Sequence, residues 1–379
     1  MIHPHIIRAV HLVSGIVLGL ITLFTPRNKK RVIFNSSLNN FYNFNSRYLF
    51  EYFLERNKYE CFFVINDDAR RANLITKIGP YFISSKGLKN KLFILTASTW
   101  VCSTMETPVG GFLLSFRRFV YNLGHGVPIK KAGIAQEKYI WYKDLYYKMV
   151  RTNFTKFLAT SLYSQDRYSA MYGCATEQIV INPQPRLSSV KVVERDDSKL
   201  KVLYAPTWRE GGTSFFSFED VNECELLKFL SENNICIYLH PHPVRTQYVS
   251  RIKECEYVQV IKPNPERDVT GYLADFDILM TDYSSIYVDY LVLNRPVFFV
   301  FYETQDFNDE IGVFDGGKDF SIGPQINSQK ELILELEKVV QKKDEYISAR
   351  KEMSLKLNGD FKQGDECKIN YDFITAQLQ

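Results

Sequence analysis

Short apolar runs alternate with longer amphipathic segments through the first half of the chain. The runs predict buried strands, and apolar residues spaced by three and four between them are typical of helices. The predicted strands are 31–37, 59–66, 92–102 and 180–182, and the predicted helices are 46–57 and 141–157. Strands that alternate with helices of this length indicate a parallel sheet with crossover helices.

A second alternation of the same kind begins near residue 200. Its predicted strands are 201–207, 235–240, 257–262, 277–283 and 296–301, and its predicted helices are 218–234 and 328–357. Residues 188–201 between the halves are polar and charged, which is typical of a linker. We therefore predict an α/β protein with two doubly wound Rossmann-like domains, 31–190 and 191–345, that face a cleft. A segment of residues 1–30 precedes them, and a helical segment of residues 346–379 follows.

The first 30 residues form a separate amphipathic segment. Their apolar run, 12–24, has 13 residues, whereas a spanning helix needs about 20. Pro26 and the basic cluster 29–31 follow it, in place of the small residues that mark a signal-peptide cleavage site. We predict a helix that lies on the inner membrane leaflet, with its basic flank attracted to anionic lipid. The alternatives are a helix packed on the protein's own surface and a helix that spans the membrane.

The distribution of charge separates this segment from the body of the protein. The 379 residues include 47 Lys and Arg and 43 Asp and Glu, a net charge of +4. The first 50 residues hold six basic side chains and no acidic one, so residues 51–379 have a net charge of −2. A near-neutral body disfavours nucleic acid as a partner, because such proteins present a basic surface.

Disulfide and metal chemistry are also disfavoured. The seven cysteines are scattered without a C-x-x-C pair, which argues against a disulfide scaffold or zinc module and for a reducing compartment. Asp275 and Asp277 have the D-x-D spacing of metal–nucleotide sites, but their neighbours are apolar. No phosphate-binding P-loop, G-x-G-x-x-G, H-E-x-x-H or G-x-S-x-G motif occurs. We therefore expect no metal at the site.

One of the six histidines, His125, lies in a segment suited to catalysis. It stands between Gly124 and Gly126, which let the backbone approach a ligand closely, and Lys130 and Lys131 follow. Histidine is the usual general base near neutral pH, and the lysines suit a partner that carries phosphate. The alternative is a structural histidine held in a tight turn.

Three further segments supply candidate ligands for phosphate at the ends of predicted strands. Arg209 emerges after strand 201–207, and arginine pairs well with phosphate, although an arginine here is often only a surface ion pair. The second segment is Y-L-H-P-H-P-V-R, 238–245, with two His-Pro pairs. In the third, a buried strand runs into a Ser-Ser pair that opens a helix, which provides hydroxyls and backbone N–H groups for a phosphate. Asp289 follows one helical turn later, where it could reach a ribose hydroxyl or orient the loop. The alternative for the Ser-Ser pair is an ordinary helix cap without a ligand.

Taken together, these segments resemble the CDP-glycerol glycerophosphotransferase family, the polyol-phosphate transferases of teichoic acid and capsule synthesis. The resemblance spans roughly residues 33–345. It rests on F-N-S-R-Y-L-F-E-Y-F (44–53), G-H-G-V-P-I-K-K-A-G-I (124–134), L-Y-A-P-T-W-R-E (203–210), the His-Pro segment, and G-Y-L-A-D-F-D-I-L-M-T-D-Y-S-S-I-Y-V-D-Y (271–290) with the following Arg295-Pro296. The last block is the most specific because of its length.

The resemblance implies a glycosyltransferase B fold and a peripheral enzyme on the cytoplasmic face of the bacterial membrane. Its activity would be transfer of glycerol phosphate from CDP-glycerol, or ribitol phosphate from CDP-ribitol, to a lipid-linked or oligosaccharide hydroxyl, with release of CMP. The N-terminal domain would bind the acceptor and the C-terminal domain the CDP-polyol, with no cofactor beyond this donor. By position, the implied catalytic residues are His125 and His242, and the implied donor-binding residues are Arg209, His240, Thr281, Asp282, Ser284, Ser285 and Asp289.

Two departures from the family pattern bear on the site. Gly124 and Val127 replace the usual Trp and Thr beside the histidine, which affects the identity of the acceptor. Leu187 and Ser188 replace the Asn-Asp that usually follows Pro-Arg near the linker. A nucleotide-sugar glycosyltransferase of the same fold and a non-catalytic, membrane-tethered binding protein are the alternative functions.

Overall fold

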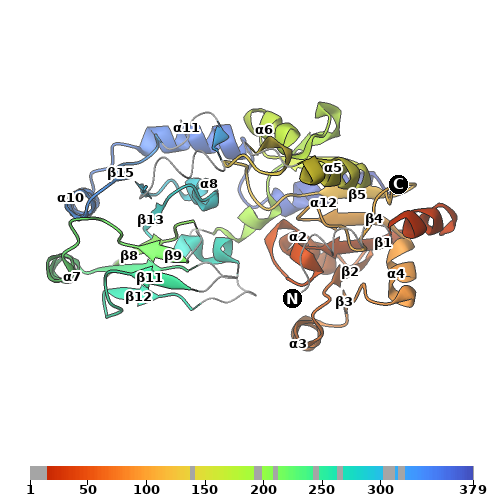
Figure 1. Ribbon diagram of the computed structural model, residues 1–379, viewed down its shortest axis with the longest axis horizontal. Helices are drawn as coiled ribbons and strands as arrows, with labels where there is room; N and C mark the ends of the chain where they lie inside the picture. The colour runs from red at the N-terminus through yellow and green to blue at the C-terminus, as the bar shows by residue number, and fades with distance from the viewer. Residues whose placement is uncertain are drawn as a thin grey trace.

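Two parallel β-sheets form the cores of two lobes in the computed structural model of the protein (Figure 1). The structure describes residues 15–136, 141–191, 199–207, 212–241, 247–262, 268–301, 312–314 and 321–378. Every strand pair of the two large sheets is parallel, and helices separate most of the successive strands, so the predicted α/β class with parallel sheets is confirmed.

The first lobe holds a seven-stranded sheet in the order β3-β2-β1-β4-β5-β6-β7. Its strands are β1 (Asn28–Asn35), β2 (Glu60–Val64), β3 (Phe82–Ile83), β4 (Ala97–Cys102), β5 (Phe119–Asn122), β6 (Lys156–Ala159) and β7 (Ile179–Ile181). Its helices are α2 (Phe44–Arg56), α3 (Asp68–Ile78), α4 (Leu88–Leu95), α5 (Trp141–Val150) and α6 (Leu162–Tyr172). Residues 32–35 of β1 and 99–102 of β4 are fully buried, as expected for a sheet covered on both faces.

The second lobe repeats this topology with six strands in the order β12-β10-β8-β13-β14-β15. Its strands are β8 (Leu200–Tyr204), β10 (Ile235–Leu239), β12 (Val258–Val260), β13 (Ile278–Thr281), β14 (Val297–Val300) and β15 (Gln325–Ile326), and a small pair is formed by β9 (Thr213–Phe215) and β11 (Tyr248–Ser250). Its helices include α7 (Glu223–Glu232), α8 (Ile286–Tyr290) and α10 (Gln329–Val340).

Each sheet has one point where the strand order reverses. The reversal lies between β1 and β4 in the first sheet and between β8 and β13 in the second. Loops diverge at such a point, and open α/β sheets bind their ligands there, beyond the carboxyl ends of the strands. The loops after these four strands therefore define where a site can form.

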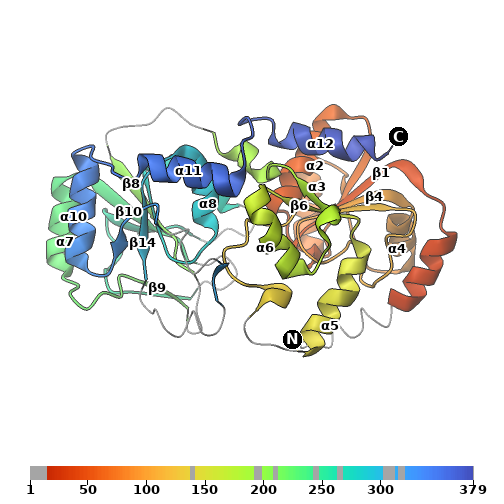
Figure 2. The same ribbon diagram turned by 90° about the horizontal axis from the view of Figure 1, so that it is seen from above.

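The last two helices join the lobes. Helix α11 (Ile347–Asn358) packs in the second lobe, and α12 (Glu366–Ala376) returns to lie on the first lobe beside α2 (Figure 2). The Tyr371 ring of α12 lies 4.6 Å from the Phe53 ring of α2 at a tilt of 57°, and Asn370 Nδ2 donates to the Pro183 carbonyl oxygen. The C-terminal segment is thus a strap that completes the first lobe.

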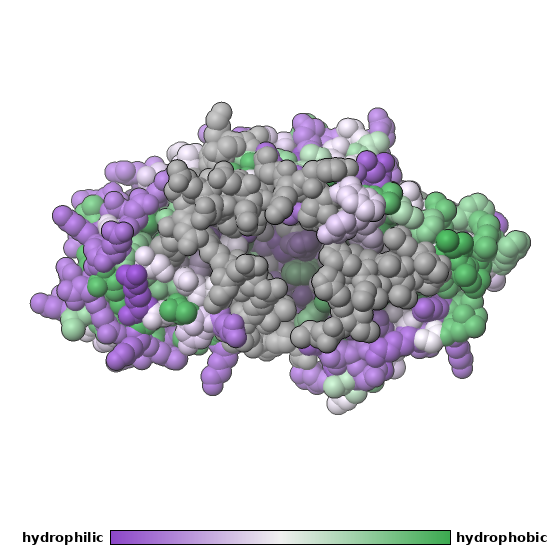
Figure 3. Space-filling model, in the orientation of Figure 1, coloured by the Kyte–Doolittle hydropathy of each residue, from purple (hydrophilic) through white to green (hydrophobic). Residues whose placement is uncertain are grey.

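The N-terminal apolar segment forms a helix over residues 15–24 that packs on the first lobe with one side only. Leu18 and Thr22 are buried, whereas Phe24 is 87% exposed and the apolar side chains of the outer face also reach solvent: Ile16, Val17, Leu20 and Leu23. Figure 3 shows this face as a hydrophobic patch at one end of the molecule. Among the described residues, no helix is long and apolar enough to cross a membrane.

Three predicted elements are wrong in their boundaries. The segment 328–357, expected to be one helix, is two helices, α10 and α11, with turns between them. The segment 92–102, expected to be one strand, is the end of helix α4 followed by β4, because Leu92–Leu95 alone satisfies either structure. The segment 141–157, expected to be one helix, is α5, a short 3-10 turn and the start of β6. Strand β5, which precedes His125, was not among the predicted elements.

Candidate active site

A cavity of about 1120 Å³ lies between the lobes and opens in the hollow at the centre of Figure 3. The first lobe contributes the loops that follow β1 to β5, and the second lobe contributes the loop after β13. His125 and Lys130 line it from one side, and Tyr283, Ser284 and Ser285 line it from the other. Both strand-order reversals therefore open onto this cavity.

The backbone around His125 is fixed by the end of β5. Asn122, the last residue of the strand, accepts a hydrogen bond from Gly124 N at 2.8 Å. Gly124 has φ of +62° and Gly126 has φ of +149°, which glycine adopts without the strain of a side chain. The Tyr168 hydroxyl donates to the Gly126 carbonyl oxygen at 2.9 Å. The loop thus presents His125 while its own polar groups are satisfied.

The imidazole of His125 is exposed to the cavity and held on two sides. Its Nδ1 lies 3.3 Å from the Ser103 carbonyl oxygen, and its ring lies 5.3 Å from the Phe44 ring. Desolvation by the cleft walls lowers the pKa of His125, and the nearby charge of Arg186 lowers it further. A neutral imidazole whose Nδ1–H donates to Ser103 leaves Nε2 ready to accept a proton.

On the opposite wall, Ser284 and Ser285 present hydroxyls at the start of the short helix α8. Ser285 is the capping residue, but its side chain makes no capping hydrogen bond. A Cβ built on Gly126 would lie 3.2 Å from Ser285 Oγ, so the base loop and the serine loop almost touch. Two of the sequence-predicted residues of the donor half are therefore brought next to the predicted base.

A short relay holds a cation at this junction. Lys130 Nζ donates to Thr207 Oγ1 at 3.1 Å, and Thr207 donates in turn to Asp282 Oδ1 through its hydroxyl at 2.6 Å and its backbone N at 2.7 Å. Asp282 is buried behind the loop. The Asp282 carboxylate thus holds Thr207, and Thr207 holds the Lys130 ammonium group. Lys130 lines the cavity, where its ammonium group could contact a phosphate.

Asp289, expected to reach a ribose hydroxyl or to orient the loop, lies where the two lobes meet. Its carboxylate is 1% exposed and does not line the cavity. It accepts hydrogen bonds from Arg186 at 2.8 and 2.9 Å, from Thr270 Oγ1 at 3.0 Å and from Gln184 Nε2 at 3.4 Å. Burial raises the pKa of Asp289, and the charge of Arg186 opposes this shift. Both carboxylate oxygens of Asp289 are thus engaged by residues of the two lobes, and its contact with a ribose stays a prediction.

The remaining predicted residues fall into two groups. Thr281 is buried and donates to the Ala205 carbonyl oxygen, and His240, at the end of β10, donates its backbone N to Tyr204; neither lines the cavity. Arg209 and His242 lie outside the residues that the structure describes. Thr281 thus fixes the end of β13 where the loop with Ser284 and Ser285 begins. The placement of Arg209 and His242 stays a prediction.

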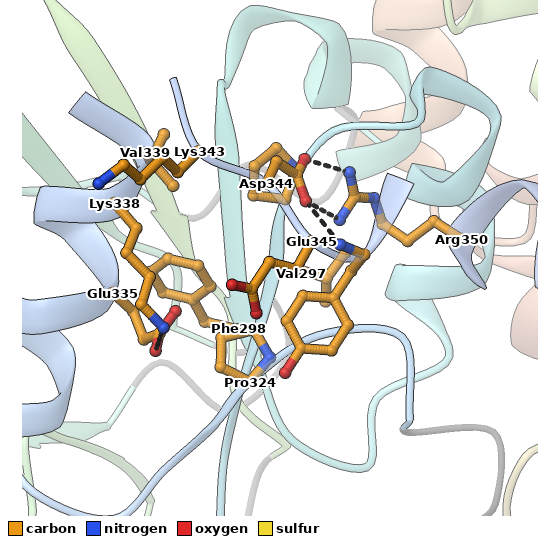
Figure 4. Close-up of a pocket in the computed structure, with 12 residues that line it drawn as sticks. Val297, Phe298, Pro324, Glu335, Lys338, Val339, Lys343, Asp344, Glu345 and Arg350 are labelled. Carbon is orange, nitrogen blue, oxygen red and sulfur yellow. Dashed lines mark hydrogen bonds and ion pairs between the residues drawn. The ribbon is translucent and has the colours of Figure 1, made fainter. Parts of the chain in front are cut away.

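A second pocket, of about 20 Å³, lies far from these groups in the second lobe. Figure 4 shows it between β14, α10 and the loop that leads into α11, where Arg350 pairs with Asp344. Arg350 is 1% exposed, so this pair fastens α11 and offers no reactive group. In the described part of the chain, no group of three or more His, Cys, Asp or Glu side chains is placed to hold a metal ion.

The residues that sequence reasoning missed are those that join the lobes. The pairs Arg186–Asp289 and Phe44–Asp268 are 103 and 224 residues apart in the chain. No local motif marks such a pair, and the Arg of the Pro-Arg segment was noted only through the residues that follow it. The Ser103 carbonyl could not be predicted from the sequence, because every residue has a backbone carbonyl group.

Two Rossmann-like lobes with a cavity at the strand-order reversals define a fold of the glycosyltransferase B type. A family model described as CDP-glycerol:poly(glycerophosphate) glycerophosphotransferase matches residues 18–365. The chain therefore belongs to this family of enzymes, which confirms the resemblance seen in its motifs.

Curated relatives agree with this assignment. The chain is 24% identical over 366 residues to a teichoic acid poly(glycerol phosphate) polymerase of Bacillus spizizenii, covering 89% of this chain and 90% of that protein. It is also 24% identical over 350 residues to a teichoic acid glycerol-phosphate transferase of Staphylococcus aureus, covering 85% and 87% respectively.

Solved structures share the fold. The wall teichoic acid polymerase TagF superposes with a TM-score of 0.74 at 20% identity, covering 98% of this chain and 97% of that one. A UDP-N-acetylglucosamine 2-epimerase from Listeria monocytogenes, described as putative, gives a TM-score of 0.56 at 10% identity, covering 93% and 97%. These similarities concern the arrangement of the two domains.

Proposed function

We propose that this enzyme transfers glycerol phosphate from CDP-glycerol to a hydroxyl of a poly(glycerophosphate)-type acceptor in teichoic acid synthesis and releases CMP. The observation that carries the proposal is the approach of the two loops at the cavity. The His125 loop of the first lobe and the Ser284–Ser285 loop of the second nearly touch across it. Family membership supplies the donor and the reaction class.

In the proposed mechanism His125 is the general base. The acceptor hydroxyl gives its proton to Nε2 of His125 as its oxygen attacks the distal phosphorus of CDP-glycerol. A new P–O bond forms to the acceptor, the bond from that phosphorus to the bridging oxygen breaks, and the electron pair leaves with CMP. Phosphoryl transfer depends mainly on positioning and on stabilisation of the oxygens that gain charge.

Residues on the second lobe and the Lys130 relay supply this stabilisation. Lys130 provides a positive charge that Thr207 and Asp282 hold in place. Ser284 and Ser285 provide hydroxyls at the cavity wall. Arg209 and His242 are proposed to add cationic contacts to the phosphates, as the family pattern implies. In the proposed mechanism these groups stabilise the charge without a metal ion.

The acceptor is proposed to enter from the first lobe. Beyond His125 the cavity continues along the carboxyl ends of β1, β2 and β3, where Asn39, Asn66 and Ser85 line it with Lys86 and Lys91. Carboxamides and hydroxyls suit a polyol, and the lysines suit the phosphodiesters of a polymer. This charge pattern supports an anionic polyol chain as the acceptor.

The helix over residues 15–24 supports a peripheral position on the inner membrane leaflet. It packs on the loop that contains Gly111, and the same loop exposes two further apolar side chains, Leu113 and Phe116. Lys29 and Lys30, which are exposed at the start of β1, follow a few residues after the helix. An apolar face beside basic residues is the arrangement that binds an anionic lipid surface, which is where a lipid-linked acceptor would be found.

The test is product analysis with the purified enzyme. It would be incubated with CDP-glycerol, CDP-ribitol or UDP-N-acetylglucosamine and a phosphodiester-linked glycerol oligomer, and nucleotide release and product mass would be measured. We expect CMP from CDP-glycerol and a product heavier by one or more glycerol phosphate units. Transfer from the nucleotide sugar without transfer from CDP-glycerol would overturn the proposal.

A further inference from the structure

The base loop is tied to the second lobe through a buried arginine. Arg186 lies in the 3-10 helix Pro185–Ser189 at the end of the first lobe. Its Nη1 donates to the His125 carbonyl oxygen at 2.6 Å, and its Nη2 pairs with Asp289 Oδ2 at 2.8 Å. Desolvation would lower the pKa of Arg186, but the charges of Asp289 and Asp268 raise it. One guanidinium therefore contacts both lobes and remains charged.

A second connection reaches the other side of the same histidine. Asp268, on the second lobe, accepts a hydrogen bond from Phe44 N at 3.1 Å. Phe44 opens helix α2 with φ of +58°, and its ring lies 5.3 Å from the His125 ring. The unusual backbone at Phe44 is thus held by a carboxylate of the opposite lobe while its side chain covers the imidazole.

The two connections share one anchor. Thr270 donates its backbone N to Asp268 Oδ1 at 3.2 Å and its hydroxyl to Asp289 Oδ2 at 3.0 Å. Asp289 belongs to α8, which begins directly after Ser285. Asp289 is therefore part of the element that follows the serine loop, and Thr270 links Asp268, the capping residue of the 3-10 helix Val269–Asp275, to it.

We propose that Arg186 and Phe44 are positioning residues that lock His125 to the donor-binding lobe. The proposal rests on the proposed role of His125 as base. Through Asp289 and Asp268, the base and the Ser284–Ser285 loop keep one relative position, so the acceptor oxygen and the donor phosphorus meet at a fixed distance. A displacement of about 1 Å from such a position can cost about 100-fold in rate.

The geometry of the arginine makes the proposal specific. A guanidinium donates in a planar fork and serves the His125 carbonyl and the Asp289 carboxylate at once. A lysine at this place keeps the charge but, as a single ammonium on a flexible stem, cannot hold both groups in that fixed arrangement. Arg186→Lys therefore separates the charge of this residue from its bridging role.

The experiment uses the full-length enzyme with Arg186→Lys and Asp268→Ala. Asp220→Ala is the matched control, because Asp220 also accepts backbone N–H bonds, from Gln329 and Lys330, but lies within the second lobe away from the cavity. The measurements are kcat and KM for CDP-glycerol, CDP affinity by calorimetry, the melting temperature, and the ¹⁵N imidazole NMR signals of His125.

We expect both bridge variants to lose about 10- to 100-fold in kcat while CDP affinity stays within about twofold, and to change the His125 imidazole signals. Asp220→Ala should change neither. Unchanged imidazole signals in both bridge variants would overturn the proposal, as would equal losses of kcat and CDP affinity in the bridge and control variants. Asp268 is partly exposed, so its variant remains informative if Arg186→Lys fails to fold.

The NMR signals separate this proposal from the proposed function. If the wild-type enzyme releases no CMP from CDP-glycerol, the proposed function fails. Altered His125 signals in the bridge variants would still show that the opposite lobe positions this ring, and unaltered signals would overturn the positioning proposal whatever the substrate.

Discussion

The Nδ1 atom of His125 lies 3.3 Å from the backbone carbonyl oxygen of Ser103. Ser103 follows β4 and His125 follows β5, and these strands pair side by side at their carboxyl ends, Cys102 with Asn122. The Ser103 hydroxyl is itself bonded to Ser46 of α2. The orientation of the imidazole is therefore set by the sheet and its nearest helix, and a donated Nδ1–H directs Nε2 to the cavity.

The pH dependence of the reaction should report the environment of this imidazole. Desolvation and the charge of Arg186 lower the pKa of His125 below its ordinary value of 6.5. A base with a lowered pKa stays neutral at lower pH, so kcat/KM should be constant through pH 7 and fall only below 6.5. The measurement is kcat/KM for CDP-glycerol from pH 5 to 9; an acid limb centred above 6.5 would contradict this assignment.

Lys130 should contribute mainly to binding of the donor phosphates. Replacing it with methionine removes a charge-assisted contact and should raise KM for CDP-glycerol about tenfold, because hydrogen bonds to charged groups contribute about 1.5–3 kcal/mol. Lys130→Arg should recover part of the loss. Steady-state kinetics would test this, with Lys338→Met, an exposed lysine paired with Glu335 on α10, as the control. An unchanged KM in Lys130→Met would exclude the contact.

Gly126→Ala tests how closely the two loops approach. The added methyl would lie 3.1 Å from Arg186 Nη2 and 3.2 Å from Ser285 Oγ, at a φ of +149°. We expect CMP release to fall at least about tenfold and the free energy of unfolding to fall by about 1–3 kcal/mol. Gly364→Ala is the control, because it has φ of +96° with no atom within 4 Å of the new methyl. Equal activity losses in both variants would attribute the effect to backbone strain alone.

The apolar outer face of the helix over residues 15–24 should mediate membrane binding. Leu20 is 58% exposed on this face, and Leu334 is 51% exposed on α10 of the other lobe. Leu20→Glu should reduce cosedimentation with vesicles that contain anionic lipid, because it replaces an apolar side chain that would enter the lipid with a charged one. Leu334→Glu should not reduce it. CDP affinity should be unchanged in both. Undiminished cosedimentation of Leu20→Glu would show that another surface binds the lipid.

Much of the fold follows from the sequence because the strands are short apolar runs between amphipathic helices. The parallel α/β class and the positions of β1, β2, β10 and β14 are predicted in this way. The prediction of a single strand over 92–102 was wrong because a four-residue apolar run fits a helix end as well as a strand. Strand β5 was missed although its four residues lead directly into the His125 loop.

The site was predictable where a functional group follows a strand within a few residues. His125, Lys130, Ser284 and Ser285 all line the cavity, as this rule requires. Asp289 shows the limit of such reasoning, because its spacing from the serines suggested a ligand contact. Its actual partner, Arg186, is 103 residues away in the chain, and only the folded arrangement of the lobes reveals it.

The most direct test of the account compares wild-type enzyme with His125→Ala in the presence of CDP-glycerol and a phosphodiester-linked glycerol oligomer. CMP release and the mass of the product would be followed, and CDP affinity would be measured by calorimetry. The account predicts CMP release with stepwise addition of glycerol phosphate by the wild type, loss of both in His125→Ala, and similar CDP affinity in the two proteins. Continued CMP release and chain extension by His125→Ala would contradict it.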